Sequence, residues 1–216
     1  MRSLQNSVVA VVGASGGLGR ELVRLAQDRG ATVLGCGRSG PDVELDLRND
    51  DAGETLTSVA QARFGRLDMV IVAAGVVAFG DLAETEPVVV EELFLTNAMG
   101  PLWLARTVMP ALGASKGCFA AITGVVAETA YPGMAAYAAS KSALSHGLSA
   151  WRREARRHGI GVLDARPPHT ETGLATRPLA GTAPRMPTGL SPSAVAQRII
   201  EGIEADESEI PSSAFV

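Results

Sequence analysis

Short runs of apolar residues alternate along the chain with stretches in which apolar residues recur at helical spacing. The β-type runs cover residues 8–12, 31–35, 43–45, 69–73, 119–123 and 161–165. The first helical pattern starts at Leu18 and stops at Gly30, and others follow at 56–64, 87–112, 137–151 and 191–203. Strands that alternate with helices in this way predict βαβ units and a parallel sheet.

This pattern predicts a single α/β domain over residues 1–216, built on a doubly wound parallel sheet of about six to seven strands. A chain of 216 residues with 46% hydrophobic residues can form one sizeable core and leaves little room for a second domain. Ligands of such sheets bind at the carboxyl ends of the strands. Residues 167–190 are rich in Pro, Thr and Gly and predict an irregular loop. We expect this loop to cover the substrate, because specificity resides in such loops.

Charge and composition argue against several classes of partner. The net charge of −4 and the isoelectric point near 5.4 give no attraction for nucleic acid or anionic membranes. The apolar runs, such as the one that ends at Val12, are judged too short to span a bilayer, and the N-terminus lacks a signal-peptide layout. Cys36 and Cys118 are expected to be buried free thiols. We expect a cytoplasmic protein without a metal site.

A glycine-rich turn joins the first predicted strand to the first predicted helix. Gly13, Gly17 and Gly19 follow the spacing G-x-x-x-G-x-G. Glycines let the backbone approach a pyrophosphate closely, and a helix N-terminus offers free N–H groups and a positive dipole end. A glycine-rich connection without a ligand has the same composition, but the position at the first strand–helix junction favours a dinucleotide.

Tyr137 and Lys141 stand four residues apart on a predicted helix and therefore project from one face. A free phenol titrates near pH ~10, and a cation beside it lowers its pKa, which would make Tyr137 an acid–base group. Taken alone, the pair is better explained by a tyrosine in the apolar stripe and a lysine that extends to solvent.

Asn97 lies in the long predicted helix, four residues before Pro101. Proline lacks the N–H that would bond the Asn97 carbonyl, so this carbonyl is freed from the helical ladder. The alternative is an ordinary helix kink with a solvated side chain.

The glycine turn, Asn97 and the segment Tyr137-Ala138-Ala139-Ser140-Lys141 together resemble the short-chain dehydrogenase/reductase family in order and spacing, from about Val8 to Leu174. The resemblance implies a single-domain Rossmann fold in which Tyr137 is the acid/base. It implies that Lys141 lowers the tyrosine pKa and holds the nicotinamide ribose, and that the Asn97 carbonyl supports a water relay. The remaining cofactor contacts that it implies are Gly13, Ser15, Gly17, Leu18, Gly19, Ala74, Gly75, Pro167, Thr170 and Thr172. Family members commonly pair through the Asn97 and Tyr137 helices, so a homodimer or homotetramer is expected.

The chain departs from the family pattern at the active-site serine. The family places this serine thirteen residues before the tyrosine, and that position here is Gly124. Loss of one oxyanion-type donor typically costs about a hundred- to thousandfold in turnover. Three outcomes stay open: a slow or specialised enzyme, rescue by Thr123 or His169, or cofactor binding without catalysis. Thr123 can serve only if the backbone turns locally, because adjacent strand residues point to opposite faces.

The end of the second predicted strand bears on the choice of cofactor. Gly37 occupies the position where an acidic residue would hold the ribose of NAD, and Arg38 and Ser39 follow. A guanidinium and a hydroxyl suit the additional phosphate of NADP, so we expect NADP rather than NAD. A solvent-exposed loop arginine is the alternative. Asp46 and Leu47 resemble the adenine contact of the family.

The leading hypothesis is an NADP-dependent oxidoreductase that interconverts a small-molecule carbonyl and an alcohol by hydride transfer. The rival is a non-catalytic or weakly active cofactor-binding member, a sensor or partner-binding subunit, because of Gly124. A relative that modifies nucleotide sugars shares the Y-x-x-x-K spacing but usually needs a longer substrate domain. His169, Arg177 and Arg185 of the loop could touch a polar or anionic group of the substrate.

Overall fold

The computed structural model of the chain describes residues 1–39 and 41–215. These residues form a seven-stranded sheet in the order β3-β2-β1-β4-β5-β6-β7, with every neighbouring pair parallel. The order reverses between β1 and β4, which places a crevice at their carboxyl ends. The strands are β1 (Val8–Val12), β2 (Thr32–Gly37), β3 (Val43–Glu44), β4 (Met69–Val72), β5 (Cys118–Ile122), β6 (Gly161–Ala165) and β7 (Glu209–Ile210).

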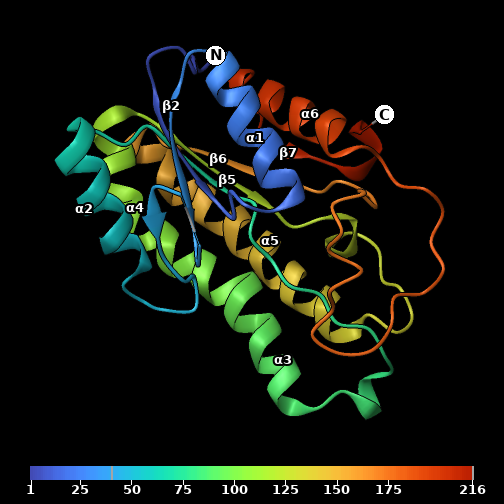
Figure 1. Cartoon of the computed structure of the whole chain (residues 1–216). Coiled ribbons are helices and arrows are strands. Elements are labelled where there is room, and N and C mark those ends of the chain that lie inside the picture. The colour runs from blue at the N-terminus through green and yellow to red at the C-terminus, as the bar shows by residue number, and fades with distance from the viewer. Residues whose placement is uncertain (40, 216) are drawn as a thin grey trace.

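Helices cover both faces of the sheet (Figure 1). Alternate residues of a strand point to opposite faces, so Ala10 packs beneath α2, α4 and α5 whereas Val9 and Val11 pack beneath α1 and α6. The predicted doubly wound α/β fold is therefore confirmed. The α-helices are α1 (Gly17–Asp28), α2 (Ala52–Phe64), α3 (Pro87–Phe94), α4 (Gly100–Ser115), α5 (Ala135–Ala155) and α6 (Pro192–Glu204), and the 3-10 turns are Leu82–Glu84, Val125–Ala127, Arg156–His158 and Ser212–Ala214.

The long predicted helix over 87–112 is continuous but changes character in its middle. A π-helical turn, Leu95–Met99, joins α3 to α4, and the Gly100 N–H donates to the carbonyl five residues back, at Leu95. Pro101 directly follows this turn, in keeping with its missing N–H. By length and mean hydropathy (1.2), the whole run Pro87–Ser115 would be long enough to cross a membrane, contrary to the expectation that every apolar stretch is too short. In the fold, buried side chains on both halves of this run pack into the domain.

The loop 167–190 runs over the carboxyl edge of the sheet (Figure 1). Leu179 N donates to the Val77 carbonyl, and Phe79 N donates to the Ala180 carbonyl. These bonds tie the loop to the segment that follows β4. Cys36 and Cys118 are buried free thiols, as expected.

Candidate functional site

The glycine turn lies where β1 ends, and close backbone contacts explain two of its glycines. Gly13 has φ +90°, and a Cβ at this position would lie 2.6 Å from the Ala74 nitrogen. A Cβ at Gly19 would lie 2.0 Å from the Gly13 carbonyl oxygen. Any side chain at either position would therefore push the turn away from the start of α1 or from the end of β4. The turn leads directly into α1, which begins at Gly17, and a helix N-terminus offers free N–H groups to a pyrophosphate.

Gly17 brings the loop 167–190 into the same site. A Cβ at Gly17 would lie 2.7 Å from the Thr172 carbonyl oxygen. Thr172 is thus brought to the glycine turn, although the two lie 155 positions apart in the chain. Ser15 is exposed, whereas the Leu18 side chain is buried in the core, so that only the backbone of Leu18 can face a ligand.

Two predicted site residues from distant helices meet at Gly75. A Cβ on Gly75 would lie 3.2 Å from both Asn97 Oδ1 and Lys141 Nζ. The Asn97 side chain is fixed by its hydrogen bonds: Oδ1 accepts from Val76 N, and Nδ2 donates to Val76 O, each at 2.9 Å. Nδ2 also lies 3.1 Å from Ser140 Oγ on α5. The amide of Asn97 therefore links the segment that follows β4 to α5, a role that sequence reasoning did not assign to its side chain.

Tyr137 and Lys141 lie on the inner face of α5, with 9% and 5% of their surface exposed. Lys141 Nζ donates to the Ile122 carbonyl at 2.9 Å. Burial lowers the pKa of Lys141 to about 8, against the opposing attraction of Asp164. Burial also raises the pKa of Tyr137 to about 12. The expected lowering of the tyrosine pKa by Lys141 is therefore wrong for the chain without cofactor, where burial disfavours the phenolate and raises this pKa.

The backbone conformation of Gly124 and the hydrogen bond of the Thr123 hydroxyl were not indicated by the sequence. Gly124 has φ +86° and ψ 165°, a region that is essentially restricted to glycine. Thr123 is 1% exposed, and its Oγ1 donates to Asp164 Oδ1 at 2.5 Å. A hydroxyl has one proton to donate, so Thr123 cannot also donate to a substrate oxygen. The expectation that Thr123 could replace the missing serine is corrected on this ground.

His169, the other residue proposed to replace the serine, lies in the segment after β6 and contacts that segment itself. His169 Nε2 lies 3.3 Å from Glu171 Oε1. The buried Pro167 accepts a hydrogen bond from Val125 N through its carbonyl. Thr170 forms a bridge with Leu190 and donates from Oγ1 to the Pro168 carbonyl at 2.9 Å. These contacts order both ends of the loop.

The predicted adenosine contacts gather at the ends of β2 and β3. Arg38 and Ser39 are exposed, while the Leu47 side chain is buried in the core. Hydrogen bonds from Arg48 lower the pKa of Asp46, and the charge of Arg38 contributes, which shows that the two ends are close. Arg48 also reaches Glu92 on α3 at 3.3 Å. Sequence reasoning missed Arg48, although its place two residues after Asp46 was a usable signal.

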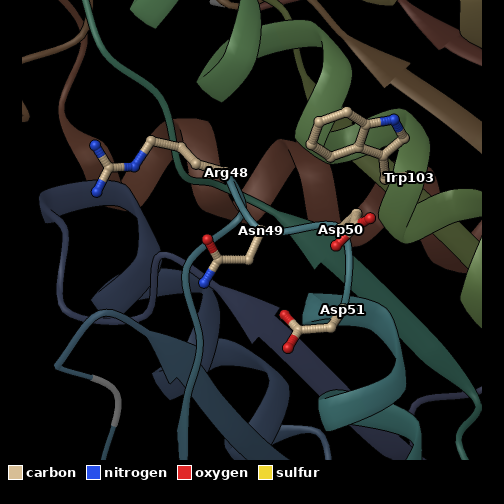
Figure 2. A pocket seen from close by; sticks show the side chains of 5 residues that line it. All are labelled: Arg48, Asn49, Asp50, Asp51 and Trp103. Carbon is tan, nitrogen blue, oxygen red and sulfur yellow. The ribbon is translucent and has the colours of Figure 1, made fainter.

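A pocket opens beside this corner, between the segment 48–51 and α4 (Figure 2). Two carboxylates, Asp50 and Asp51, line it together with Arg48, Asn49 and the ring of Trp103. Adjacent carboxylates disfavour a phosphate, so we do not place the dinucleotide in this pocket.

Comparisons with known proteins agree on one family. Residues 7–180 match the family model described as short chain dehydrogenase. The chain is 27% identical to Dehydrogenase/reductase SDR family member 7B of Bos taurus, over 96% of the chain and 73% of that protein, and 28% identical to the Danio rerio protein of the same name, over 93% and 75%.

Solved structures give the same picture. A short chain dehydrogenase from Burkholderia cenocepacia in complex with NADP has a TM-score of 0.84 at 25% identity and covers 99% of this chain and 91% of its own. A short chain dehydrogenase/reductase from Burkholderia phymatum in complex with NAD has a TM-score of 0.86 at 20% identity, over 98% and 90%. The second likeness concerns the fold alone.

Proposed function

The chain belongs to the short-chain dehydrogenase family, and from this premise we propose that it is an NADP-dependent oxidoreductase that interconverts a carbonyl and an alcohol. The observation that carries the proposal is the meeting of Lys141 Nζ and Asn97 Oδ1 at Gly75, 3.2 Å each from the position of a Cβ there. Gly75 follows directly on Ala74, whose nitrogen lies against the glycine turn. The groups proposed for chemistry and for cofactor binding therefore share one edge of the sheet.

The residues of this edge fit a nicotinamide dinucleotide. Gly13, Gly17 and Gly19 let the turn pack closely against Ala74, Thr172 and itself, and the first turn of α1 offers N–H groups to a pyrophosphate. Ser15 can add its exposed hydroxyl. Thr172, whose backbone lies against Gly17, and Thr170 are proposed to meet the nicotinamide end, together with the backbone of Pro167, Ala74 and Gly75.

Arg38 and Ser39 carry the proposed preference for NADP. Both side chains are exposed at the end of β2, where a guanidinium can form paired charge-assisted hydrogen bonds with the additional phosphate. Asp46 and the backbone of Leu47 are proposed to meet the adenine. Solved relatives are described with NADP and with NAD, so the preference must come from residues of this chain.

In the proposed reaction the reduced nicotinamide supplies the hydride. Tyr137 donates its phenolic proton to the carbonyl oxygen, so that one hydride and one proton convert the carbonyl to an alcohol. The ammonium of Lys141 then stabilises the phenolate that remains, until a proton returns from solvent. Because burial raises the pKa of Tyr137 to about 12, the phenol is protonated before this step at neutral pH.

Among the described residues, position 124 supplies no side-chain donor that would share the negative charge on the substrate oxygen. Gly124 has no side chain, and its N–H donates to the Ala165 carbonyl, as does that of Thr123. The Val125 N–H donates to the Pro167 carbonyl. We therefore expect turnover about a hundred- to thousandfold below that of a comparable site with a serine donor.

The proposed cofactor preference is tested by titrating NADPH and NADH into wild type and Arg38→Ala. Loss of a hydrogen-bonded charge pair should weaken NADPH binding roughly 10- to 100-fold and leave NADH binding nearly unchanged. Arg106→Ala, which removes an exposed arginine on α4, is the matched control and should change neither. Equal loss for both cofactors would contradict the assignment of Arg38 to the phosphate.

The proposed activity is tested by following NADPH consumption with a panel of aldehydes, ketones and quinones. Turnover of at least one compound supports the oxidoreductase. Tight NADPH binding without any turnover would instead support the rival cofactor-binding role.

Assembly as a homodimer or homotetramer through the Pro87–Ser115 run and α5 is a further proposal, tested by light scattering after size-exclusion chromatography. A cytoplasmic location also stays a proposal.

A further inference from the structure

A buried carboxylate to which the proposed reaction assigns no role contacts Ser145, which lies one helical turn after Lys141 on α5. Asp164 on β6 is 1% exposed. Its Oδ1 accepts from Thr123 Oγ1 at 2.5 Å, and its Oδ2 accepts from Ser145 Oγ at 2.6 Å. Arg166 Nε lies 3.1 Å from Oδ2. Groups from the chain just after β5, from α5 and from the chain just after β6 thus converge on one carboxylate.

A carboxylate in this strand calls for a physical explanation. The rest of β6 is apolar or glycine, and an apolar residue at position 164 would avoid the cost of desolvating a charge. Thr123 and Ser145 hold Asp164 through hydroxyls, which are neutral. Arg166 carries a positive charge, but it does not pair with Asp164 alone, because it also forms ion pairs with Glu128 and Glu209.

Lys141 is the other buried charge in this region. Its ammonium makes one hydrogen bond among the described residues, to the neutral Ile122 carbonyl. Ser145 stands four residues after Lys141 on α5, so the two side chains project from the same face of the helix. Because Ser145 donates to Asp164, this carboxylate lies on the face of α5 that carries the ammonium.

We propose that Asp164 is a positioning residue that keeps Lys141 protonated, by holding a fixed negative charge in the core on the same face of α5. Its importance for turnover rests on the proposed function, in which Lys141 acts as a cation, whereas the relation between the two charges does not. The attraction of Asp164 opposes the burial that lowers the pKa of Lys141 to about 8.

Besides Asp164, few of the described groups around Lys141 carry a charge that could change its protonation. Tyr137 on α5 is neutral at pH 8, since burial raises its pKa to about 12. Asn97 and Gly75 meet the ammonium from the π-helical turn and from the end of β4, and neither titrates. Arg166, whose Nε lies 3.1 Å from Asp164 Oδ2, carries a positive charge, and a cation disfavours the protonated form of a nearby lysine.

The proposal can be tested directly because the chain contains two lysines, Lys116 and Lys141. In protein labelled with 13C at the lysine ε-carbon, NMR follows both side chains through a pH titration, and Lys116→Arg assigns the signals. Exposed Lys116 is the internal reference. We expect Asp164→Asn to move the Lys141 midpoint from about pH 8 to lower pH, by roughly one pH unit.

Two further variants separate charge from packing. Ser145→Ala removes one hydrogen bond to Asp164 but leaves its charge, so the Lys141 midpoint should stay close to that of wild type. Arg166→Gln removes a nearby cation and should raise the midpoint, and it tests the proposal even where Asp164→Asn fails to fold. The proposal is overturned if folded Asp164→Asn leaves the Lys141 midpoint unchanged, if Ser145→Ala lowers it equally, or if Arg166→Gln lowers it.

Turnover supplies a second readout with a distinct pH signature. A midpoint one unit lower reduces the protonated fraction of Lys141 roughly fivefold at pH 8 and hardly at all at pH 6. Asp164→Asn should therefore lose activity at pH 8 and regain it at pH 6, whereas a structural defect would lower activity at both. If the wild type has no activity at all, the proposed function fails and the NMR titration still decides the role of Asp164.

Discussion

Gly124 offers a direct way to test how the site departs from its family. Its backbone, at φ +86° and ψ 165°, lies in a region that side chains disfavour, so Gly124→Ser is not a simple restoration of a missing hydroxyl. An added Cβ would meet only the Pro167 carbonyl oxygen within 4 Å, at 3.8 Å. The penalty of the substitution is therefore one of backbone strain rather than of packing.

The magnitude follows from two opposing effects. A residue held in such a conformation costs about 1–3 kcal/mol. Replacing glycine also restricts the unfolded chain, which returns about 0.4–1 kcal/mol. With the middle of each range, the net loss in the free energy of unfolding is about 1.3 kcal/mol, which lowers the melting temperature of a chain of this size by roughly 3–5 °C.

Thermal and denaturant unfolding of wild type, Gly124→Ala and Gly124→Ser measure this loss. Both variants should be destabilised to a similar extent, because the strain lies in the backbone and not in the hydroxyl. Their turnover should also be similar, since the strained serine is not held at the substrate oxygen. A Gly124→Ser protein that is as stable as wild type, or at least tenfold faster than Gly124→Ala, would refute the reasoning.

Further predictions concern the two halves of the site. Tyr137→Phe should lower turnover about 100- to 10,000-fold with little change in NADPH affinity by calorimetry, because only the acid is lost; a retained rate would contradict its role. Gly17→Ala should weaken NADPH binding and increase proteolysis within 167–190, because its Cβ would lie 2.7 Å from the Thr172 carbonyl; unchanged binding and proteolysis would contradict this contact. Burial lowers the pKa of Lys141 from 10.5 to about 8, so the unfolded chain binds the extra proton between these values and stability should rise with pH there. Denaturant unfolding should show this rise in wild type, and Lys141→Met should lose it; an equal rise in both would contradict the assignment.

Much of the fold could be predicted from the sequence because its signals are local. Alternating strands and helices with glycine stops define the doubly wound sheet, and the strand β1 was predicted with its observed bounds. The two-residue strand β7 was not located, because Glu209–Ile210 is too short to show a period and forms only by pairing with β6. The Pro87–Ser115 run was predicted as a helix, but its membrane-spanning length was not recognised, because polar Asn97 and Pro101 interrupt the apolar run.

The spacing of motifs in the sequence predicted which residues form the site, but not how deeply they are buried or which distant residues they contact. The spacing of Tyr137 and Lys141 placed them on one face, and the structure brings Lys141 to Asn97 and Gly75. The pKa of Tyr137 was predicted in the wrong direction, because spacing does not reveal how deeply a phenol is buried. The partner of the Thr123 hydroxyl could not be foreseen either, since Asp164 lies 41 residues away and meets it only through the pairing of β5 with β6.

The most direct test of the central claim is the rate of NADPH oxidation, followed at 340 nm with a carbonyl panel, in wild type and in Tyr137→Phe side by side. The account predicts that wild type reduces at least one carbonyl slowly, and that Tyr137→Phe, with NADPH still bound, reduces it at least a hundredfold more slowly. Equal rates for the two proteins, or no oxidation of NADPH by wild type with any compound, would contradict it.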